Sequence, residues 1–216
     1  MTEQITHHLP DELMMSYAAG TLPEAFSLVV ATHISLCDEC RARLVEFEAV
    51  GGAVLETADE VELSEGALEA TMKLISSRAK DPIKAIRTSS GVFPKPLQDY
   101  VGGDLASVKW RRIGGGVKQA IVPTSKAANA RLLFIPAGAE MPDHGHAGTE
   151  MTLVLQGAYL DDDDRFGRGD IEVANEDMEH TPVADIGEDC ICLIATDGPL
   201  RFNSLIPRMA QKLLRI

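Results

Sequence analysis

Three residues near the start of the chain have the types and the spacing of a metal site. His33, Cys37 and Cys40 form a His-x3-Cys-x2-Cys cluster. On a continuing helix, positions 33 and 37 lie one turn apart and share a face, and Cys40 then falls at the start of the next helix. Thiolate and imidazole are the ligands that zinc prefers, so this cluster predicts a zinc site.

Zinc takes four ligands in a tetrahedron, and the cluster supplies three. His7 and His8 are the other two histidines of this part, and a chain that folds back at residues 20–23 brings one of them to the cluster. The alternative is that His33 is a partly buried helical residue and the cysteines are small core residues. A helical domain of about 80 residues buries only ~60% of its unfolded surface, so we expect its folding to be coupled to metal occupancy.

A second group of candidate ligands lies in the later part of the chain. His144 and His146 are two residues apart, so on a strand both side chains project to the same side. Glu150 follows on the next extended stretch, and His180 lies beyond a turn at residues 169–170. The alternative is a set of surface or core histidines that bind no metal.

Three further features of this part could take part in chemistry or could have only a structural role. Cys190 and Cys192 alternate on a strand and face the same way, which fits core packing or an oxidant-sensitive pair near His180. The four acids at 161–164 lack the spaced oxygens of a calcium loop and predict a solvated turn. Arg131 is a candidate ligand-binding arginine on a strand face that the sequence does not assign.

Four helices are expected to position the first cluster. The first runs over residues 11–20 with Asp11 as its cap, the second from Pro23 toward position 37, the third over residues 38–50, and the fourth follows a capping Ser64. The third helix is predicted to bury an apolar stripe: Leu44, Val45, Phe47 and Val50. The fourth carries an exposed apolar side that is a candidate binding face: Leu68, Met72, Leu74 and Ile75.

The pattern of apolar residues changes after a segment that has no regular hydrophobic periodicity. Residues 81–98 carry three prolines and a Ser-Ser-Gly, and predict a linker. Beyond it, short apolar runs separated by turn residues are typical of an all-β sandwich or barrel. Five strands are expected, at 117–123, 130–136, 151–159, 170–174 and 190–196. The sequence thus predicts an α+β multidomain chain, with a helical domain at 1–80 and a β domain at 99–216.

The charge of the chain excludes some functions. The 216 residues carry a formal net charge of −13, and 15 acidic against 6 basic side chains place −9 of it within residues 1–85. This balance argues against direct nucleic-acid binding and favours a basic partner protein. With no apolar run long enough to span a membrane and no signal-peptide pattern, we expect a cytoplasmic chain without a membrane partner.

The second group of ligands resembles the two motifs of the cupin superfamily over residues 99–205. The first motif is complete from Gly138 to Gly157, whereas the second keeps Gly169 and His180 but lacks the usual later asparagine. The resemblance implies a C-terminal all-β cupin barrel and a metal bound by His144, His146, Glu150 and His180. Zinc, iron, manganese and nickel all remain open.

The whole chain resembles the ChrR family of zinc-binding anti-sigma factors. The residues that carry this are the His33/Cys37/Cys40 cluster with its upstream histidines, the run YAAGTLPEAFSLVVATHISLCDECRAR, and the later PDHGH, MTLVLQGAY, EHTPV and RFNS segments. The resemblance implies that His8, rather than His7, is the fourth zinc ligand. It also implies that the helical half binds an extracytoplasmic-function sigma factor, and that the cupin half governs release on an oxidative signal such as singlet oxygen.

Two alternatives to a non-enzymatic regulator remain at this stage. One is a metal-dependent cupin enzyme, such as a dioxygenase with a helical appendage. The other is a transcriptional module that binds a small molecule in the barrel and has no sigma partner. The sigma factor, the signal, the barrel metal, the role of Cys190 and Cys192, and the oligomeric state do not follow from the sequence.

Overall fold

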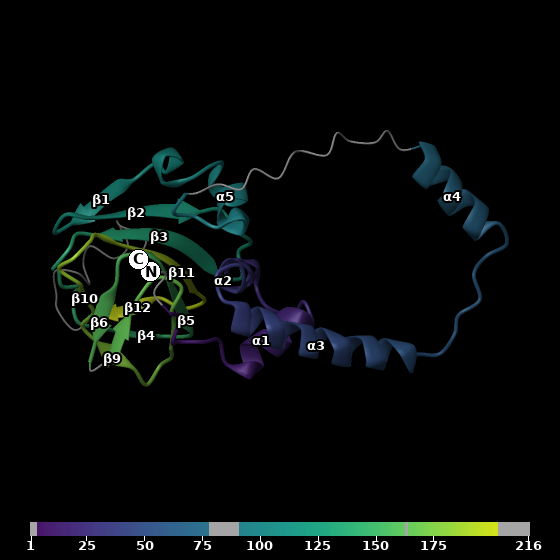
Figure 1. Cartoon of the computed structure of the whole chain (residues 1–216), viewed down its shortest axis with the longest axis horizontal. Helices are drawn as coiled ribbons and strands as arrows, with labels where there is room; N and C mark the ends of the chain where they lie inside the picture. Colours follow the sequence, from purple (N-terminus) through teal and green to yellow (C-terminus); the bar gives the residue numbers. More distant parts are fainter. Residues whose placement is uncertain (1–3, 78–90, 163, 203–216) are drawn as a thin grey trace.

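The computed structural model describes residues 4–77, 91–162 and 164–202. Three consecutive helices open the chain, and a fourth stands away from the rest at the end of an extended segment (Figure 1). Their bounds are α1 Asp11–Ala18, α2 Glu24–Ile34, α3 Asp38–Glu56 and α4 Ala67–Ser77. A fifth helix, α5 (Lys95–Val101), and a 3-10 turn, η1 (Leu105–Ser107), precede the strands. No helix of the described part is long and apolar enough to cross a membrane.

Prolines fix where the first two helices begin. Pro10 and Pro23 are the N-cap residues of α1 and α2, where a missing N–H costs nothing. The prediction that Asp11 caps the first helix is therefore wrong, because Asp11 is already helical. It lies in the first turn, where a carboxylate is stabilised by the helix dipole.

Only the first half of α3 packs against α1 and α2, so the predicted apolar stripe is wrong in part. Leu44 is buried and Phe47 is half-buried, whereas Val45 and Val50 are 60% and 64% exposed. Val45 lies on the side of α3 that faces away from Leu44 and Phe47. Val50 lies where the helix continues toward Glu56 beyond the body of the molecule, and no other described element covers it there (Figure 1).

Helix α2 connects the helical part to the strands. It contacts the helices α1, α3 and α5 and also the strands β3, β5 and β11. Its buried apolar residues belong to the same core cluster as those strands. The expected division at 1–80, 81–98 and 99–216 stays a prediction. Residues 81–90 of the expected linker lie outside the described residues, and α5 begins within its last part.

The strands form one large sheet and two small ones. The large sheet has the order β1-β2-β3-β11-β5-β8, and the small sheets have the orders β10-β6-β7 and β12-β4-β9. The large-sheet strands are β1 Arg111–Gly114, β2 Val117–Val122, β3 Asn129–Ile135, β5 Glu150–Gln156, β8 Ile171–Ala174 and β11 Cys190–Thr196. The others are β4 His144–His146, β6 Tyr159–Asp161, β7 Asp164–Phe166, β9 Glu179–His180, β10 Val183–Ala184 and β12 Leu200–Phe202.

All five predicted strands are found in the large sheet, but the predicted barrel is not closed. Within the described ranges, no ladder of backbone hydrogen bonds pairs a strand of a small sheet with a strand of the large one. Pro142 and Pro182 stand next to the short strands β4 and β10, and proline cannot donate the backbone hydrogen bond that would extend a ladder. The outcome is a cupin-like arrangement of facing sheets.

Strand β11 is covered on both faces, which explains why its sequence is apolar throughout. Every residue of the strand is buried. Ile191, Leu193 and Ala195 belong to the core shared with α2, whereas Cys192 and Ile194 line a cavity on the opposite face. Because both faces are covered, the strand has a continuous apolar run and no alternation.

A buried carboxylate attaches the N-terminal segment to the β part. Asp170 is 3% exposed, and its Oδ1 accepts hydrogen bonds from the backbone N–H groups of Thr6 (2.7 Å) and His7 (2.9 Å). Its Oδ2 accepts a third from the N–H of Gly167 at 2.8 Å. Hydrogen bonds to an ionised group contribute more to stability than neutral ones.

Replacing Asp170 should therefore loosen this attachment. We expect Asp170→Ala to lower the free energy of unfolding by about 2–3 kcal/mol in urea titrations, because three N–H groups lose an ionised acceptor. The matched control is Asp164→Ala, which removes an exposed carboxylate 4.0 Å from the His7 ring and should change stability by less than ~0.5 kcal/mol. Equal effects of the two changes would contradict this account.

Candidate metal centres

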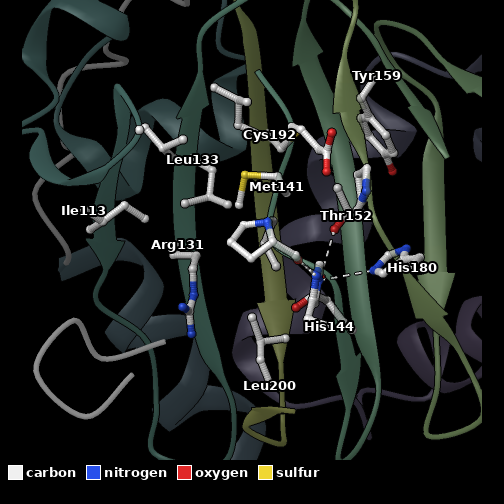
Figure 2. Close-up of a pocket in the computed structure, with 18 of the residues that line it drawn as sticks. Ile113, Arg131, Leu133, Met141, His144, Thr152, Tyr159, His180, Cys192 and Leu200 are labelled. Carbon is white, nitrogen blue, oxygen red and sulfur yellow. Dashed lines mark hydrogen bonds between the residues drawn. The ribbon is translucent and has the colours of Figure 1, made fainter. Parts of the chain in front are cut away.

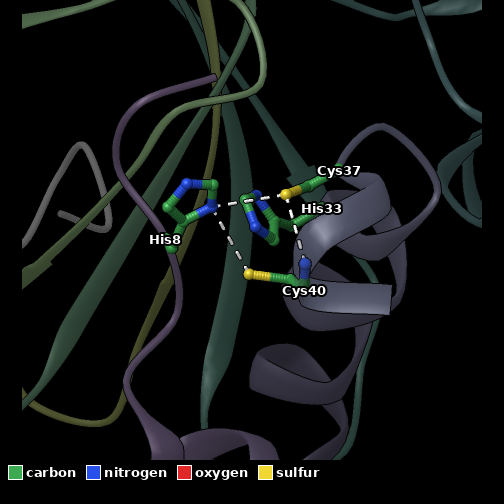
Figure 3. Close-up of side chains that lie close together, drawn as sticks. All are labelled: His8, His33, Cys37 and Cys40. Carbon is green, nitrogen blue, oxygen red and sulfur yellow. Dashed lines mark hydrogen bonds between the residues drawn. The ribbon is translucent and has the colours of Figure 1, made fainter. Parts of the chain in front are cut away.

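The first cluster forms where three segments meet. His8 comes from the extended chain before α1, His33 from the last turn of α2, and Cys37 and Cys40 from the start of α3 (Figure 3). The Nδ1 of His8 lies 3.3 Å from Sγ of Cys37 and 3.6 Å from Sγ of Cys40. One ligand atom from each of the four residues lies within 4.8 Å of all the others. Ligands of a tetrahedral zinc ion lie about 3.5 Å apart, so the four side chains are close to this arrangement.

The ring of His33 is held so that one nitrogen faces the cluster. Its Nδ1 lies 2.9 Å from the carbonyl oxygen of Gly169, which makes Nδ1 the protonated nitrogen. Its Nε2 is buried and has no hydrogen-bond partner in the described part of the chain. A buried nitrogen lone pair facing two thiols fits a metal ligand, and a carbonyl bound to the other ring nitrogen is the usual support for one.

Burial sets the protonation states of this cluster when no metal is bound. Desolvation lowers the pKa of His33 to about 4, so the ring is neutral at pH 7. Desolvation also raises the pKa of Cys40 to about 11, because a thiolate loses its hydration there. A bound divalent cation would reverse the second effect and favour the thiolate.

The structure distinguishes between the two N-terminal histidines. His7 points away from the cluster: its ring lies 4.2 Å from that of Phe166, and its Nδ1 is 3.6 Å from the carboxylate of Asp170. His8 is the one that reaches the cysteines. The ligand set expected from the resemblance, with His8, is thus brought together.

The second cluster lies between β4 and β9. His144 and His146 project from β4 on the same side, and β9 pairs with β4 so that His144 is directly opposite His180. The Nε2 of His180 lies 3.1 Å from that of His146 and 3.2 Å from that of His144. All three rings are buried, and desolvation, with a smaller contribution from the charge of the neighbouring imidazoles, lowers the pKa of His144 and His146.

Neighbouring groups orient two of these rings. The Nδ1 of His144 lies 2.8 Å from the carbonyl oxygen of Pro142, and that of His180 lies 2.6 Å from the carboxylate of Asp161. Each contact places the proton on Nδ1 and leaves the Nε2 lone pair facing the centre. Convergent lone pairs repel one another unless a cation lies between them, so this geometry fits a metal site.

Glu150 is not part of the three-imidazole group. Its Oε2 lies 3.9 Å from Nδ1 of His146, and Thr152 donates a hydrogen bond of 3.4 Å to its Oε1. Desolvation raises the pKa of Glu150, and the charge of Arg131 offsets part of this effect. The structure brings together three of the four residues expected from the cupin motif and places the fourth beside them.

Two acidic residues next to His180 were missed in the sequence analysis. Asp161 belongs to the acidic run interpreted as a solvated turn, yet it is 7% exposed and lies on β6. Glu172 accepts a 2.7 Å hydrogen bond from the hydroxyl of Tyr159, and burial raises its pKa to about 8. The alternation of buried Tyr159, exposed Leu160 and buried Asp161 is the signal that could have identified this strand.

Cys190 and Cys192 are both buried, with their sulfur atoms 3.5 Å apart. The hydrogen bond with Cys190 and desolvation raise the pKa of Cys192 well above its usual value. Because reactive cysteines have low pKa values and are accessible, this environment favours the core-packing interpretation.

The chain is 58% identical over 212 residues to the anti-sigma-E factor ChrR of Cereibacter sphaeroides, and the match covers 98% of this chain and 99% of that protein. The chain belongs to the ChrR family. Within it, residues 98–200 match the family described as the ChrR Cupin-like domain. The structure also resembles a chain in the crystal structure of Rhodobacter sphaeroides SigE in complex with the anti-sigma ChrR. The TM-score is 0.80 with 56% identity, covering 90% of this chain and 100% of that one. The ChrR resemblance inferred from the sequence is therefore confirmed.

Replacing a cysteine tests the first cluster of this ChrR-family chain. We expect Cys40→Ser to lose about one metal ion per chain in elemental analysis and to melt the α1–α3 segment, because a hydroxyl is a poor ligand for a soft site. The control Cys190→Ala removes a buried thiol outside the cluster and should keep the full metal content. Unchanged metal content in Cys40→Ser would contradict the assignment of this cluster.

The support of His180 by Asp161 is tested by a single-atom change. Asp161→Asn keeps the shape but removes the charge that favours the Nδ1–H tautomer, so metal affinity of the β part should fall about 10–100-fold in chelator competition. Asp162→Asn is the matched control, because Asp162 is exposed and its φ of 49° is one that asparagine tolerates. Equal metal affinities in the two variants would show that Asp161 does not position the ring.

Proposed function

We propose that this chain is an anti-sigma factor that binds and inhibits an extracytoplasmic-function sigma factor. The observation that carries the proposal is the near-complete similarity, in sequence and in structure, to a protein that was solved together with a sigma factor. That similarity spans the helical and the β part, and so favours the regulator over the cupin-enzyme alternative. The β part then serves regulation and not turnover.

Exposed apolar side chains along α4 and in the C-terminal half of α3 support a partner surface. Leu68, Met72 and Ile75 share one face of α4 and are 66%, 53% and 65% exposed, and no residue of that helix is buried. The C-terminal half of α3 also exposes Val54 and Leu55, at 65% and 75%. Clustered exposed apolar side chains of this kind mark protein interaction sites. The acidic charge around them suits a basic partner and disfavours DNA.

We infer that His8, His33, Cys37 and Cys40 hold a structural zinc ion. Two imidazoles and two thiolates are the ligand set of closed, four-coordinate zinc sites. Such an ion would hold the N-terminal segment, the end of α2 and the start of α3 together, which fixes the direction in which α3 leaves the body of the molecule. Its role is structural.

We infer that the β part holds a second divalent metal on His144, His146 and His180, with Glu150 as the adjacent carboxylate. Nitrogen and carboxylate ligands suit zinc as well as redox-active metals. An oxidative signal such as singlet oxygen, sensed in this half of the chain, would release the sigma factor in the cytoplasm. What supports this is the family membership and the burial of the histidine cluster, in which His144 and His180 line a cavity.

Co-expression with an extracytoplasmic-function sigma factor tests the central proposal. The complex should be recovered under reducing conditions, and Leu68→Asp together with Ile75→Asp should weaken it at least tenfold, because charged side chains replace apolar anchors. Ala70→Asp, on the opposite face of α4, is the control and should leave affinity within about twofold. Failure to recover any complex with the unaltered chain would overturn the proposal.

The role of the second metal is tested separately. His144→Ala should bind the sigma factor with unchanged affinity but fail to release it when singlet oxygen is generated by illumination of a photosensitiser, because the cluster loses a ligand while α1–α4 are untouched. The measurement is the amount of free sigma factor on size-exclusion chromatography before and after illumination. Normal release by this variant would remove the β-part metal from the signalling role.

A further inference from the structure

The three sheets enclose a cavity whose lining is mostly apolar. Its volume is about 330 Å³, at the lower end of the range for small-molecule sites. Residues of β1, β3 and β11 line one part of it, His144 of β4 and His180 of β9 line another, and β12 adds Leu200 and Phe202. Apolar side chains that line the cavity include Ile113, Val117, Leu133, Ile135, Met141, Leu200 and Phe202.

One cationic side chain is buried in this apolar wall. Arg131 lies on β3 with Leu133 two residues further on, and both side chains point toward the cavity (Figure 2). The arginine is only 6% exposed. Its Nε and Nη1 atoms are buried and have no hydrogen-bond partner in the described part of the molecule. An unsatisfied buried N–H costs about 1–3 kcal/mol, and more in a charged group, so this guanidinium is an incomplete recognition element.

Three glutamates line the cavity, Glu140, Glu150 and Glu172, and none of them accepts a hydrogen bond from the Nε or Nη1 atom of Arg131. Glu150 attracts Arg131 through its charge, but its hydrogen bond is to Thr152 and its Oε2 lies beside His146. Glu172 and Tyr159 also line the cavity, and the Oε2 of Glu172 accepts a hydrogen bond from the tyrosine hydroxyl. The Nε and Nη1 donors of Arg131, which point to different edges of the guanidinium, are therefore available to oxygen acceptors of a ligand.

We propose that the cavity binds a small organic monocarboxylate with an aliphatic body. The carboxylate accepts hydrogen bonds from Arg131, and the aliphatic chain packs against Ile113 and Leu133. A guanidinium in an apolar wall selects an anion that also carries apolar surface, which distinguishes this ligand from phosphate, sulfate or a sugar. Since His144 lines the same cavity, the ligand would lie next to the histidine cluster. The proposal does not depend on a sigma factor as partner.

Isothermal titration calorimetry on the full chain, with its metal content measured, tests this directly. The probes are sodium octanoate, 1-octanol and octylammonium chloride, which share an aliphatic chain and differ in the charge of the head group. We expect octanoate to bind at one site per chain and the other two to bind at least tenfold more weakly. Arg131→Met, which keeps the length of the side chain, should weaken octanoate at least tenfold, and Arg131→Lys should give an intermediate affinity.

Two further variants keep the test decisive. Arg165→Met removes an arginine on β7 that pairs with Asp185, and should leave octanoate binding unchanged. Ile113→Trp adds volume to the cavity from β1 and should weaken octanoate with Arg131 intact, which covers the case in which Arg131→Met fails to fold. Equal binding of octanol and octanoate, unchanged affinity in a folded Arg131→Met variant, or no binding of octanoate would each overturn the proposal. Unchanged affinity in Ile113→Trp would place the carboxylate outside this cavity.

Discussion

The packing of α2 on the large sheet is the contact on which the rest of the structure depends. One side of this helix closes the core over β3, β5 and β11, and its last turn supplies His33 to the N-terminal cluster. The helix could not do both if its apolar residues lay on a single narrow stripe, and its sequence is accordingly buried on most of its circumference. The position of the first candidate metal centre relative to the β part follows from this one interface.

The two histidine sites share one principle of construction. In each, a ring nitrogen contacts a protein oxygen and the other ring nitrogen faces the cluster: His33 on the carbonyl of Gly169, His144 on that of Pro142, and His180 on the carboxylate of Asp161. These contacts favour the tautomer with the proton on Nδ1, whether or not a metal is bound. The sites differ in what brings the ligands together, because the first depends on the meeting of three separate segments and the second on the pairing of β4 with β9.

The spacing of residues predicted much of this, because spacing along a helix or strand determines direction. His144 with His146 is a local relation that holds on any strand. The prediction of one continuing helix through His33 and Cys37 is wrong, because α2 ends at Ile34 and Cys37 is the N-cap residue of α3, so their approach depends on the turn between the two helices. What failed depends on distant neighbours. The burial of Asp161 requires β6 to face His180. The exposure of Val50 follows because α3 extends beyond the helices that it packs against, and the position of Glu150 depends on the register between strands. No local pattern records those relations.

The turn at Gly169 and Asp170 has a thermodynamic consequence. Its two residues hold His33 and the backbone of Thr6 and His7, and β8 continues from it to Glu172 beside the second cluster. The helical segment cannot separate from the sheet without breaking these hydrogen bonds at the start of β8. The two changes are therefore coupled. Displacement of β8 lowers the free energy needed to separate the two parts, and their separation lowers the free energy needed to displace β8 by the same amount.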